Sequence, residues 1–194
     1  MHLPDVVHAY PAVIGEKIKF YYVGRINYVK GVHVMVRAFM QVRDKNIELH
    51  IIGGTGNKQE LHYMNRLQRE TASDNRIVWH GKISENEVST QTKCYHVLIN
   101  SSICLETFGL NIAEALSAGK WVLSTQCGGA EMQIREGENG WLVEPDSVAA
   151  LKMAIERIIL FLPAETPRYK GYISMKEHAL HVMQIYGNVL SEKK

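Results

Sequence analysis

The sequence predicts an α/β protein in which a parallel β-sheet carries helices on both faces. Short apolar runs alternate with amphipathic stretches along most of the 194 residues, and glycine closes the first three of these runs. Such an alternation is typical of parallel strands joined by crossover helices. The length suffices for one domain with a substantial hydrophobic core, and 46% apolar and 22% charged residues are typical of a globular protein.

The elements can be placed in order along the chain. Residues 17–24 form an apolar run that predicts a buried strand, and residues 30–43 place apolar side chains at helical spacing. A second strand is expected at 47–53, a polar helix at 59–71 and a third strand at 76–81. The elements expected after these are a short helix at 85–92, a strand at 95–100, a helix at 109–118, a strand at 121–125, a short helix at 130–135 and a short strand at 141–143. Together they predict a Rossmann-like domain.

Two further helices are expected at the end of the chain. Asp146 is the predicted N-cap of a helix with one apolar face, which stops at Pro163. The stretch near 174–190 carries another apolar stripe at helical spacing. The expected organisation is a single domain over residues 1–194, with its core at about 17–162.

Charge and composition exclude several classes of function. A net charge of +2, without a long basic run or a nucleic-acid-binding motif, gives no case for a nucleic-acid partner. No segment approaches the roughly 20 apolar residues of a membrane span, and the N-terminus lacks the apolar region of a signal peptide. Cys94, Cys104 and Cys127, in apolar surroundings and without metal-ligand spacing, predict reduced thiols in a cytoplasmic protein. Peripheral contact with the inner face of a membrane is left open.

Candidate site residues follow the predicted strands. Ligands of open parallel sheets bind outside the carboxyl ends of the strands, so the loops at those ends are the most informative. The first such loop contains Gly24, Arg25 and Lys30, and the third contains Lys82 and Ile83. A guanidinium and an ammonium on the first loop would stabilise the charge of a departing nucleoside diphosphate. Taken singly, each of these cations is more often a solvated loop residue.

The most informative segment follows the fourth strand and contains two glutamates. Glu106 lies just before the expected helix, and Glu114 lies more than one turn inside it. Between them, the amides of Phe108, Gly109 and Leu110 lie near the helix N-terminus, where amides without intrahelical partners favour phosphate oxygens. An ionised carboxylate only accepts hydrogen bonds and therefore suits a ligand rich in hydroxyls. The pattern predicts a site for a sugar joined to a phosphate, although either glutamate alone would more often be a cap or a solvated residue.

Other patterns give weaker signals. The glycines at 53–56 lack the third glycine of a dinucleotide fingerprint and a following Walker lysine, so a tight turn explains them. His80 and His96 are expected to be hydrogen-bonded core or edge histidines. Ser101 and Ser102 lack the glycines of a nucleophile elbow. No Asp-x-Asp pair follows a strand, so metal-dependent sugar transfer is not indicated.

An ordered set of residues resembles the C-terminal domain of GT-B glycosyltransferases. The resemblance is closer still to the retaining, nucleotide-sugar-dependent group that includes many bacterial enzymes of polysaccharide and glycolipid synthesis. It runs from about residue 17 to the end of the chain, and its most specific part is the pair of glutamates with seven residues between them. The residues that carry it are Gly24-Arg25, Lys30-Gly31, Ser102, Glu106, Phe108-Gly109, Glu114-Ala115, Gly119, Gly128-Gly129, Glu131 and Gly137.

The resemblance implies a role for each matching position. Arg25 and Lys30 would hold the diphosphate of the sugar donor, Glu106 would face the transferred sugar, and Glu114 would bind the ribose. The further donor-binding positions would be Gly24, Phe108, Gly109, Leu110, Lys82 and Ile83. The group needs neither a metal ion nor a cofactor and retains the anomeric configuration. The implied substrate is a nucleotide-diphosphate sugar, such as a UDP-, GDP- or ADP-sugar.

The chain also departs from the pattern of that group. The group usually has a proline before the strand that here begins at Lys120, and often Pro-Ser where this chain has Ser101-Ser102. One extra residue separates Ser102 from Glu106, compared with the shorter form of the motif.

The sequence contains only one of the two Rossmann-like domains of a GT-B enzyme. We therefore expect a donor-binding domain that transfers nothing alone, the saccharide or glycolipid acceptor being bound by the absent N-terminal domain. Two alternatives stay open: a non-catalytic donor-domain subunit that needs a separate acceptor-domain partner, and a GT-B-shaped epimerase or phosphorylase. The base, the sugar and the acceptor are left undetermined.

Overall fold

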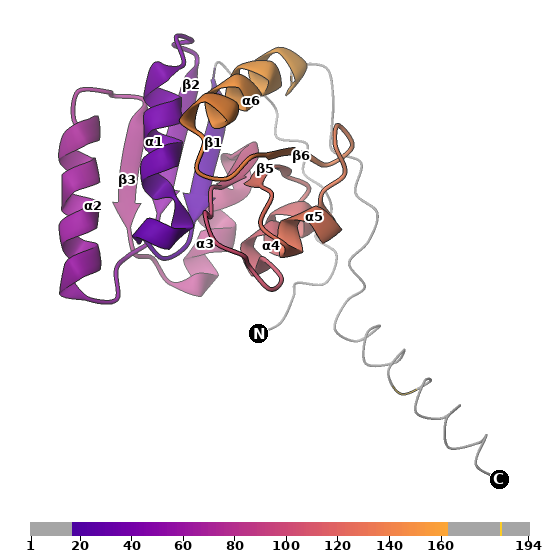
Figure 1. Cartoon of the computed structure of the whole chain (residues 1–194), viewed down its shortest axis with the longest axis horizontal. Coiled ribbons are helices and arrows are strands. Elements are labelled where there is room, and N and C mark those ends of the chain that lie inside the picture. Colours follow the sequence, from indigo (N-terminus) through magenta and orange to yellow (C-terminus); the bar gives the residue numbers. More distant parts are fainter. Residues whose placement is uncertain (1–16, 163–182, 184–194) are drawn as a thin grey trace.

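The computed structural model describes residues 17–162 and Met183. The helix expected near 174–190 lies outside the described residues apart from that methionine. Within 17–162 the predicted fold class is confirmed, because six parallel strands form one sheet with helices on both faces (Figure 1). Among the described helices, none combines the length and the apolar content needed to span a membrane.

The order of the strands identifies one point in the sheet where the direction of building reverses. The strands are β1 (Ile18–Val23), β2 (Ile47–Ile52), β3 (Ile77–Gly81), β4 (Val97–Asn100), β5 (Trp121–Thr125) and β6 (Gly140–Val143). Across the sheet they follow the order β3-β2-β1-β4-β5-β6. The chain thus builds outward from β1 to β3 and then returns to the other side of β1. The reversal lies between β1 and β4, which is where open parallel sheets bind their ligands.

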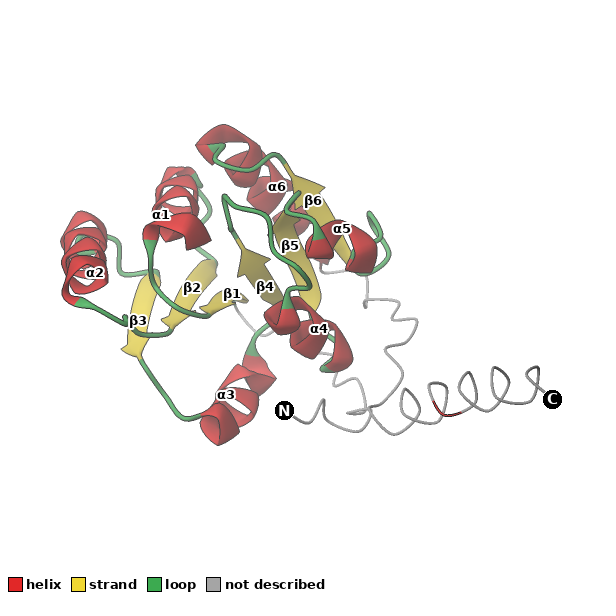
Figure 2. Cartoon of the chain, turned by 60° about the horizontal axis from the view of Figure 1, so that its bottom comes forward, coloured by secondary structure: helices red, strands yellow, loops and turns green. Residues whose placement is uncertain are grey.

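Helices separate the consecutive strands, as parallel pairing requires. They are α1 (Val32–Gln41), α2 (Lys58–Thr71), α3 (Glu85–Gln91), α4 (Leu110–Ser117), α5 (Gly129–Gln133) and α6 (Val148–Phe161), with 3₁₀ turns η1 (Tyr28–Lys30) and η2 (Thr92–Cys94). Figure 2 shows α1, α2 and α6 on one face of the sheet and α3 and α4 on the other. α5 packs beside α4.

The helix expected at 30–43 begins later than predicted. Lys30 ends the turn η1, Gly31 adopts a left-handed conformation with φ 63°, and α1 begins at Val32. A Cβ on Gly31 would lie 1.9 Å from the carbonyl oxygen of Ser101, so the approach of the two loops also requires glycine. Lys30 therefore belongs to the loop after β1 and not to the helix.

The N-cap of α6 lies one residue after the predicted position. Oγ of Ser147 accepts a hydrogen bond from the backbone N–H of Ala150 at 3.2 Å. Asp146 precedes it in a left-handed conformation with φ 56°. Asp and Ser are both good N-caps, so the sequence does not separate them. Aspartate tolerates a positive φ better than most residues, which suits Asp146 to the turn before the helix.

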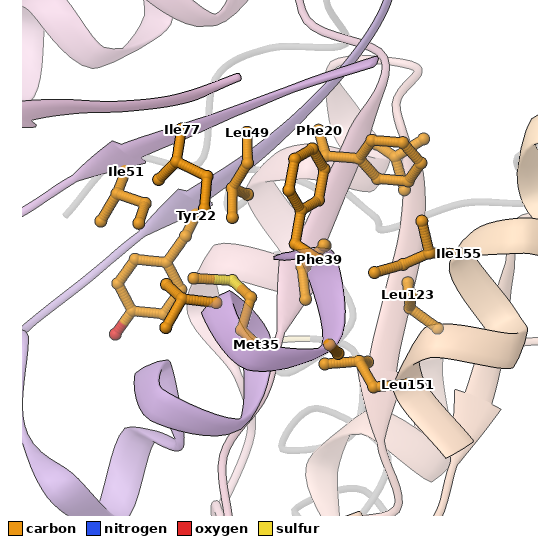
Figure 3. Close-up of a cluster of buried hydrophobic side chains, with 14 of the residues drawn as sticks. Phe20, Tyr22, Met35, Phe39, Leu49, Ile51, Ile77, Leu123, Leu151 and Ile155 are labelled. Carbon is orange, nitrogen blue, oxygen red and sulfur yellow. The ribbon is translucent and has the colours of Figure 1, made fainter. Parts of the chain in front are cut away.

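The larger hydrophobic cluster lies between the sheet and α1, α2 and α6. Figure 3 shows side chains from the strands, from α1 and from α6 meeting there, among them Phe20, Phe39, Leu49 and Ile155, each 0% exposed. The rings of Phe20 and Phe39 pack edge to face, with 6.1 Å between their centroids. Full burial of each such side chain stabilises the fold by about 1.5–3 kcal/mol.

The cluster on the opposite face is smaller. Tyr21, Leu98 and Val122 of the sheet pack there against residues of α4 and α5, among them Ile112 and Leu116. This cluster holds α4 against the strands, and the position of the N-terminus of α4 therefore depends on it.

A polar network lies beside the smaller cluster. A β-bulge between β2 and β3 leaves His80 as the extra residue of β3, and its Nε2 lies 2.9 Å from Nδ1 of His50. Nδ1 of His80 lies 2.8 Å from the side-chain amide nitrogen of Gln91 on α3. The rings of His50 and Tyr95 stack, with 4.4 Å between their centroids. The prediction that His80 is a hydrogen-bonded histidine is therefore confirmed.

His96 and the cysteines complete the comparison with the sequence. Nδ1 of His96 accepts a hydrogen bond from a backbone amide at 2.8 Å, as expected of a bonded histidine. The three cysteines are free thiols. Only Cys127 is buried, whereas Cys94 and Cys104 are exposed, so the apolar surroundings predicted for those two are wrong.

Candidate functional site

The loops that carry the predicted site residues lie at the carboxyl ends of β1, β3 and β4. Residues 24–31 connect β1 to α1, residues 82–84 follow β3, and residues 101–109 connect β4 to α4. The first and last of these loops flank the reversal between β1 and β4. The candidate residues therefore lie at the edge of the sheet where ligands of this architecture bind.

The fold brings Lys30 and Glu106 into direct contact, although 76 positions separate them in the sequence. Nζ of Lys30 donates to Oε1 of Glu106 at 2.6 Å. The two side chains are 33% and 10% exposed, so water screens this pair less than it screens a pair on the open surface. A charge-assisted hydrogen bond of this length is among the strong ones.

Further hydrogen bonds hold the two loops together independently of this ion pair. Oγ of Ser101 donates to the carbonyl oxygen of Lys30 at 2.9 Å. The backbone amide of Ile103 donates to the carbonyl oxygen of Val29, also at 2.9 Å. The backbone of Lys30 is thus fixed beside the loop that contains Glu106, and the meeting of the two charges follows from the fold.

Glu106 is held by the turn before α5. Its backbone amide donates to the carbonyl oxygen of Cys127 at 3.0 Å, and its carbonyl oxygen accepts from the amide of Gly129 at 2.9 Å. The hydroxyl of Ser102 donates to its carboxylate, and the hydroxyl of Thr125 in turn donates to the carbonyl oxygen of Ser102 at 2.6 Å. The carboxylate is therefore oriented by Ser102 and Lys30, and Thr125 on β5 fixes the backbone of Ser102.

The charge of Glu106 acts on two buried neighbours. Burial raises the pKa of Tyr22 above its ordinary value, and the negative charge of Glu106 is the second cause. Burial also raises the pKa of the Cys127 thiol, and Glu106 adds to this effect. Both groups are neutral at neutral pH. The charges at this point of the site are therefore those of Glu106 and Lys30.

The N-terminus of α4 follows directly after Glu106. Gly109 is the N-cap, with φ 79°, and its carbonyl oxygen accepts the hydrogen bond of the Ile112 amide at 3.0 Å. The amides before Ile112 lie at the positive end of the helix dipole. The left-handed backbone explains the glycine without any need for a close ligand. Phe108 and Leu110 flank it and are 40% and 45% exposed.

Glu114 is half-buried and lies further along α4. Burial raises the pKa of Tyr21 on β1, and the nearby charge of Glu114 adds to it. Asn111, three positions earlier, donates from Nδ2 to the carbonyl oxygen of Val23 at 3.4 Å. This side of α4 thus faces the end of β1 that leads to Arg25. The structure confirms that one glutamate precedes the helix and that the other lies more than a turn inside it.

Arg25 contacts a glutamate that sequence reasoning did not assign to the site. Its Nη2 and Nε lie 2.8 and 2.9 Å from the two carboxylate oxygens of Glu60 on α2. The available signal was Asn57 followed three positions later by an acidic residue, and this spacing indicates a helix cap. Nothing in it indicates an arginine on another loop.

The loop that contains Lys82 and Ile83 packs next to the glycine turn after β2. A Cβ on Gly54 would lie 3.1 Å from Cβ of Lys82, and a Cβ on Gly53 would lie 1.9 Å from the carbonyl oxygen of Gly24. Lys82 is exposed, whereas Ile83 packs in part against the smaller cluster. The glycines therefore serve the close packing of three strand-end loops, in agreement with a tight turn.

Glu131 acts as a helix cap. Its Oε1 accepts from the amide of Gly128 at 3.3 Å, and the side chain stabilises the first turn of α5. Over residues 17–162, no group of three or more His, Cys, Asp or Glu side chains is arranged to hold a metal ion.

A parallel sheet whose strand order reverses between β1 and β4, with helices on both faces, defines a Rossmann-like domain. The family model of the glycosyl transferases group 1 matches residues 9–162, which is well over half of the chain. The chain belongs to this family. An uncharacterised glycosyltransferase of Methanocaldococcus jannaschii is 25% identical over 138 residues, covering 71% of this chain and 35% of the relative.

Two solved structures share the fold. Anabaena HepE in complex with UDP matches with a TM-score of 0.68 and 23% identity, over 76% of this chain and 40% of that one, and HepE has also been solved with UDP-glucose. The C-terminal domain of LpcC, a glycosyl transferase group 1 family protein of Francisella tularensis, matches with a TM-score of 0.67 and 24% identity, over 74% of this chain and 75% of that one. The fold is that of one half of a GT-B glycosyltransferase, and the chain spans about a third of the M. jannaschii relative.

Proposed function

We propose that this chain is the donor-binding domain of a retaining glycosyltransferase. The enzyme would transfer a hexosyl group from a nucleotide-diphosphate sugar to a saccharide or lipid-linked acceptor. The observation that carries the proposal is the Lys30–Glu106 pair beside the N-terminus of α4, at the reversal of strand order. Family membership supports transfer chemistry, and the UDP and UDP-glucose complexes of HepE support a nucleotide-sugar donor.

The diphosphate of the sugar donor is assigned to the part of the site that lies between the loop after β1 and the N-terminus of α4. Arg25 and Lys30 supply two cations on one loop, and the amides of 108–110 supply neutral donors at a helix N-terminus. Glu114, on α4, accepts hydrogen bonds from the ribose hydroxyls. Lys82 and Ile83, on the loop after β3, are assigned to the base.

Glu106 is assigned to the sugar. Its carboxylate is oriented by Ser102 and Lys30 and accepts hydrogen bonds from sugar hydroxyls. When the bond between sugar C1 and the phosphate oxygen breaks, its electron pair stays on the diphosphate, where the cations stabilise the charge. The acceptor oxygen bonds to C1 on the same face, and its proton passes to an oxygen of the leaving phosphate. The anomeric configuration is thereby retained without a metal ion or cofactor.

The acceptor site is assigned to a second domain. The chain spans 35% of the M. jannaschii relative and 40% of the HepE chain. By itself it should bind a nucleotide-sugar donor and transfer no sugar.

Calorimetric titration of the 194-residue chain with UDP, GDP and ADP tests the proposal. We expect one nucleotide to bind selectively and Arg25→Ala to weaken its affinity about 10- to 100-fold, because a charge-assisted hydrogen bond is lost. Glu114→Ala should lower the affinity for the same nucleotide about tenfold, because the hydrogen bond to the ribose is lost.

Arg37→Ala is the matched control. Arg37 is an exposed arginine on α1 that pairs with Glu70 at 2.7 Å, outside the candidate site. Its loss should leave nucleotide affinity unchanged. Absence of binding for all three nucleotides at millimolar concentration would contradict the proposed function.

A further inference from the structure

The Arg25–Glu60 pair has a geometry that single-contact ion pairs lack. Nη2 and Nε of the guanidinium face the two oxygens of one carboxylate, at 2.8 and 2.9 Å. Two parallel hydrogen bonds between planar groups set the orientation of the guanidinium as well as its position. The Glu60 side chain is 13% exposed and that of Arg25 is 54% exposed. The arginine thus extends toward solvent from a shielded anchor.

Glu60 is fixed from its other side. Its carboxylate also accepts from the backbone amide of Gly56 at 2.6 Å, and Nδ2 of Asn27 lies 3.5 Å away. Its own amide donates to the side chain of Asn57, the N-cap of α2, at 2.9 Å. The hydrogen bonds from Arg25 and then from Gly56 lower the pKa of Glu60, and the positive end of the helix dipole also favours its charged form.

Gly56 provides the space in which the guanidinium lies. A Cβ at this position would be 2.5 Å from Nη2 and 2.9 Å from Cζ of Arg25. Gly56 is not among the glycines with a positive φ, so its backbone accepts other residues. A larger residue at this position would therefore displace the guanidinium and not strain the backbone, which gives a function to a glycine that the sequence explained only as part of a turn.

We propose that Glu60 is a positioning residue, which holds Arg25 over Gly56 in the orientation that binds the diphosphate of the sugar donor. The inference rests on the proposed function, in which Arg25 contacts that diphosphate. Two N–H groups of the guanidinium are committed to Glu60, and its remaining ones are available to a second acceptor. A long side chain on a loop loses less conformational freedom on binding when it is already oriented.

The sign of one substitution separates positioning from competition. If Glu60 positions Arg25, then Glu60→Gln weakens nucleoside diphosphate binding. If the carboxylate instead competes with phosphate for the guanidinium, the same change strengthens binding. We expect a loss of about tenfold, which is typical of residues in one hydrogen-bond network.

Calorimetric titration of the 194-residue chain with UDP, GDP and ADP measures this effect. Glu60→Gln and Gly56→Ala should both weaken the binding of the nucleotide that the unsubstituted chain prefers. Gly56→Ala displaces the guanidinium without a change of charge and keeps the test valid if Glu60→Gln fails to fold. In an Arg25→Ala background, Glu60→Gln should cause no further loss. A merely structural role for Glu60 would weaken binding in both backgrounds and would overturn the proposal.

Glu70→Gln is the matched control, because it makes the same carboxylate-to-amide change on the same helix. Glu70 binds Arg37 through a similar bidentate pair, at 2.7 and 3.2 Å. Its substitution should leave nucleotide affinity unchanged.

The outcomes distinguish a failure of the proposed function from a failure of the positioning role of Glu60. If no nucleotide binds the unsubstituted chain, the proposed function fails and the positioning role fails with it. If a nucleotide binds and Arg25→Ala weakens it, but Glu60→Gln leaves the affinity unchanged or raises it, only the positioning role is overturned.

Discussion

The two faces of the sheet are packed differently, although the same strands supply both. On the face of α1, α2 and α6, the cluster draws apolar side chains from all six strands, including the aromatic rings of Trp121 and Trp141. On the face of α4 and α5, the smaller cluster draws on β1, β2, β4 and β5. The polar network of His50 and His80 lies beside this smaller cluster, because His50 stacks on Tyr95, which belongs to it.

The difference separates stability from the candidate site. The larger cluster holds the sheet together, whereas α4, whose N-terminus borders the Lys30–Glu106 pair, depends on the smaller one. Truncation on the first face should mainly lower the free energy of unfolding. Truncation on the second face should also disturb ligand binding.

The largest effect is expected for Phe39→Ala on the first face. Phe39 is 0% exposed, packs against Phe20 and lies under the guanidinium of Arg76, which is 5.2 Å from its ring centroid. Loss of the ring should lower the free energy of unfolding by about 3–5 kcal/mol, measured by urea denaturation. A change below about 1 kcal/mol would contradict the dominance of this face.

Leu116→Ala on the second face should lower the free energy of unfolding by less, about 2–3 kcal/mol, which is the lower end of the usual range. Leu116 is 2% exposed and holds α4 on the sheet. The change should also weaken the binding of the preferred nucleotide, whether UDP, GDP or ADP, because the N-terminus of α4 shifts. Leu151→Ala on α6, also nearly fully buried, is the matched control and should destabilise without this loss. Equal losses of affinity in both variants would remove the distinction between the faces.

Ser147→Ala should lower the free energy of unfolding by about 1 kcal/mol, because α6 loses its N-cap. Asp146→Asn keeps a residue that tolerates a positive φ and should leave the stability unchanged. Thermal unfolding of the two variants compares them. An unchanged stability of the Ser147 variant would contradict the assignment of its hydroxyl as the cap of α6.

The smallest effect concerns the pH dependence of stability. Burial is the main cause that lowers the pKa values of His50 and His80 below 6.5. The unfolded chain then binds these protons more readily, so stability present above pH 6.5 is lost as the pH falls below it.

Substitution of one histidine in this network should therefore reduce the pH dependence. We expect the free energy of unfolding of His80→Gln to change less between about pH 7.5 and 5.5 than that of the unsubstituted chain. Burial also lowers the pKa of His33 on the first face, and it accounts for a remaining dependence. Identical slopes for the two proteins would exclude a contribution from the network on the second face.

Local sequence patterns predicted the elements well because they depend on periodicity and on the residues that end a strand or a helix. Two helix starts differ from their predicted positions for different reasons. The start of α1 depends on a contact between Gly31 and Ser101, which no local pattern contains. The start of α6 depends on a choice between two adjacent cap residues, Asp146 and Ser147, of nearly equal quality.

The candidate site was predictable as a set of loops but not as a set of contacts. Each strand-end loop could be located in the sequence, and the carboxyl ends of parallel strands share one edge. Glu60 could not be found in this way, because an acidic residue in the first turn of a helix indicates a dipole partner. Its pairing with Arg25 spans 35 positions and requires α2 to lie beside the loop after β1.

The sequence by itself determined the α/β class, nearly all of the strands and helices, and the residues available at the strand ends, because these follow from short-range spacing. Only the tertiary structure decided the order of the strands, the contact between Lys30 and Glu106, and the seat of Arg25 over Gly56. These depend on how segments far apart in the chain pack against one another, and the side-chain spacing within one segment does not determine that packing.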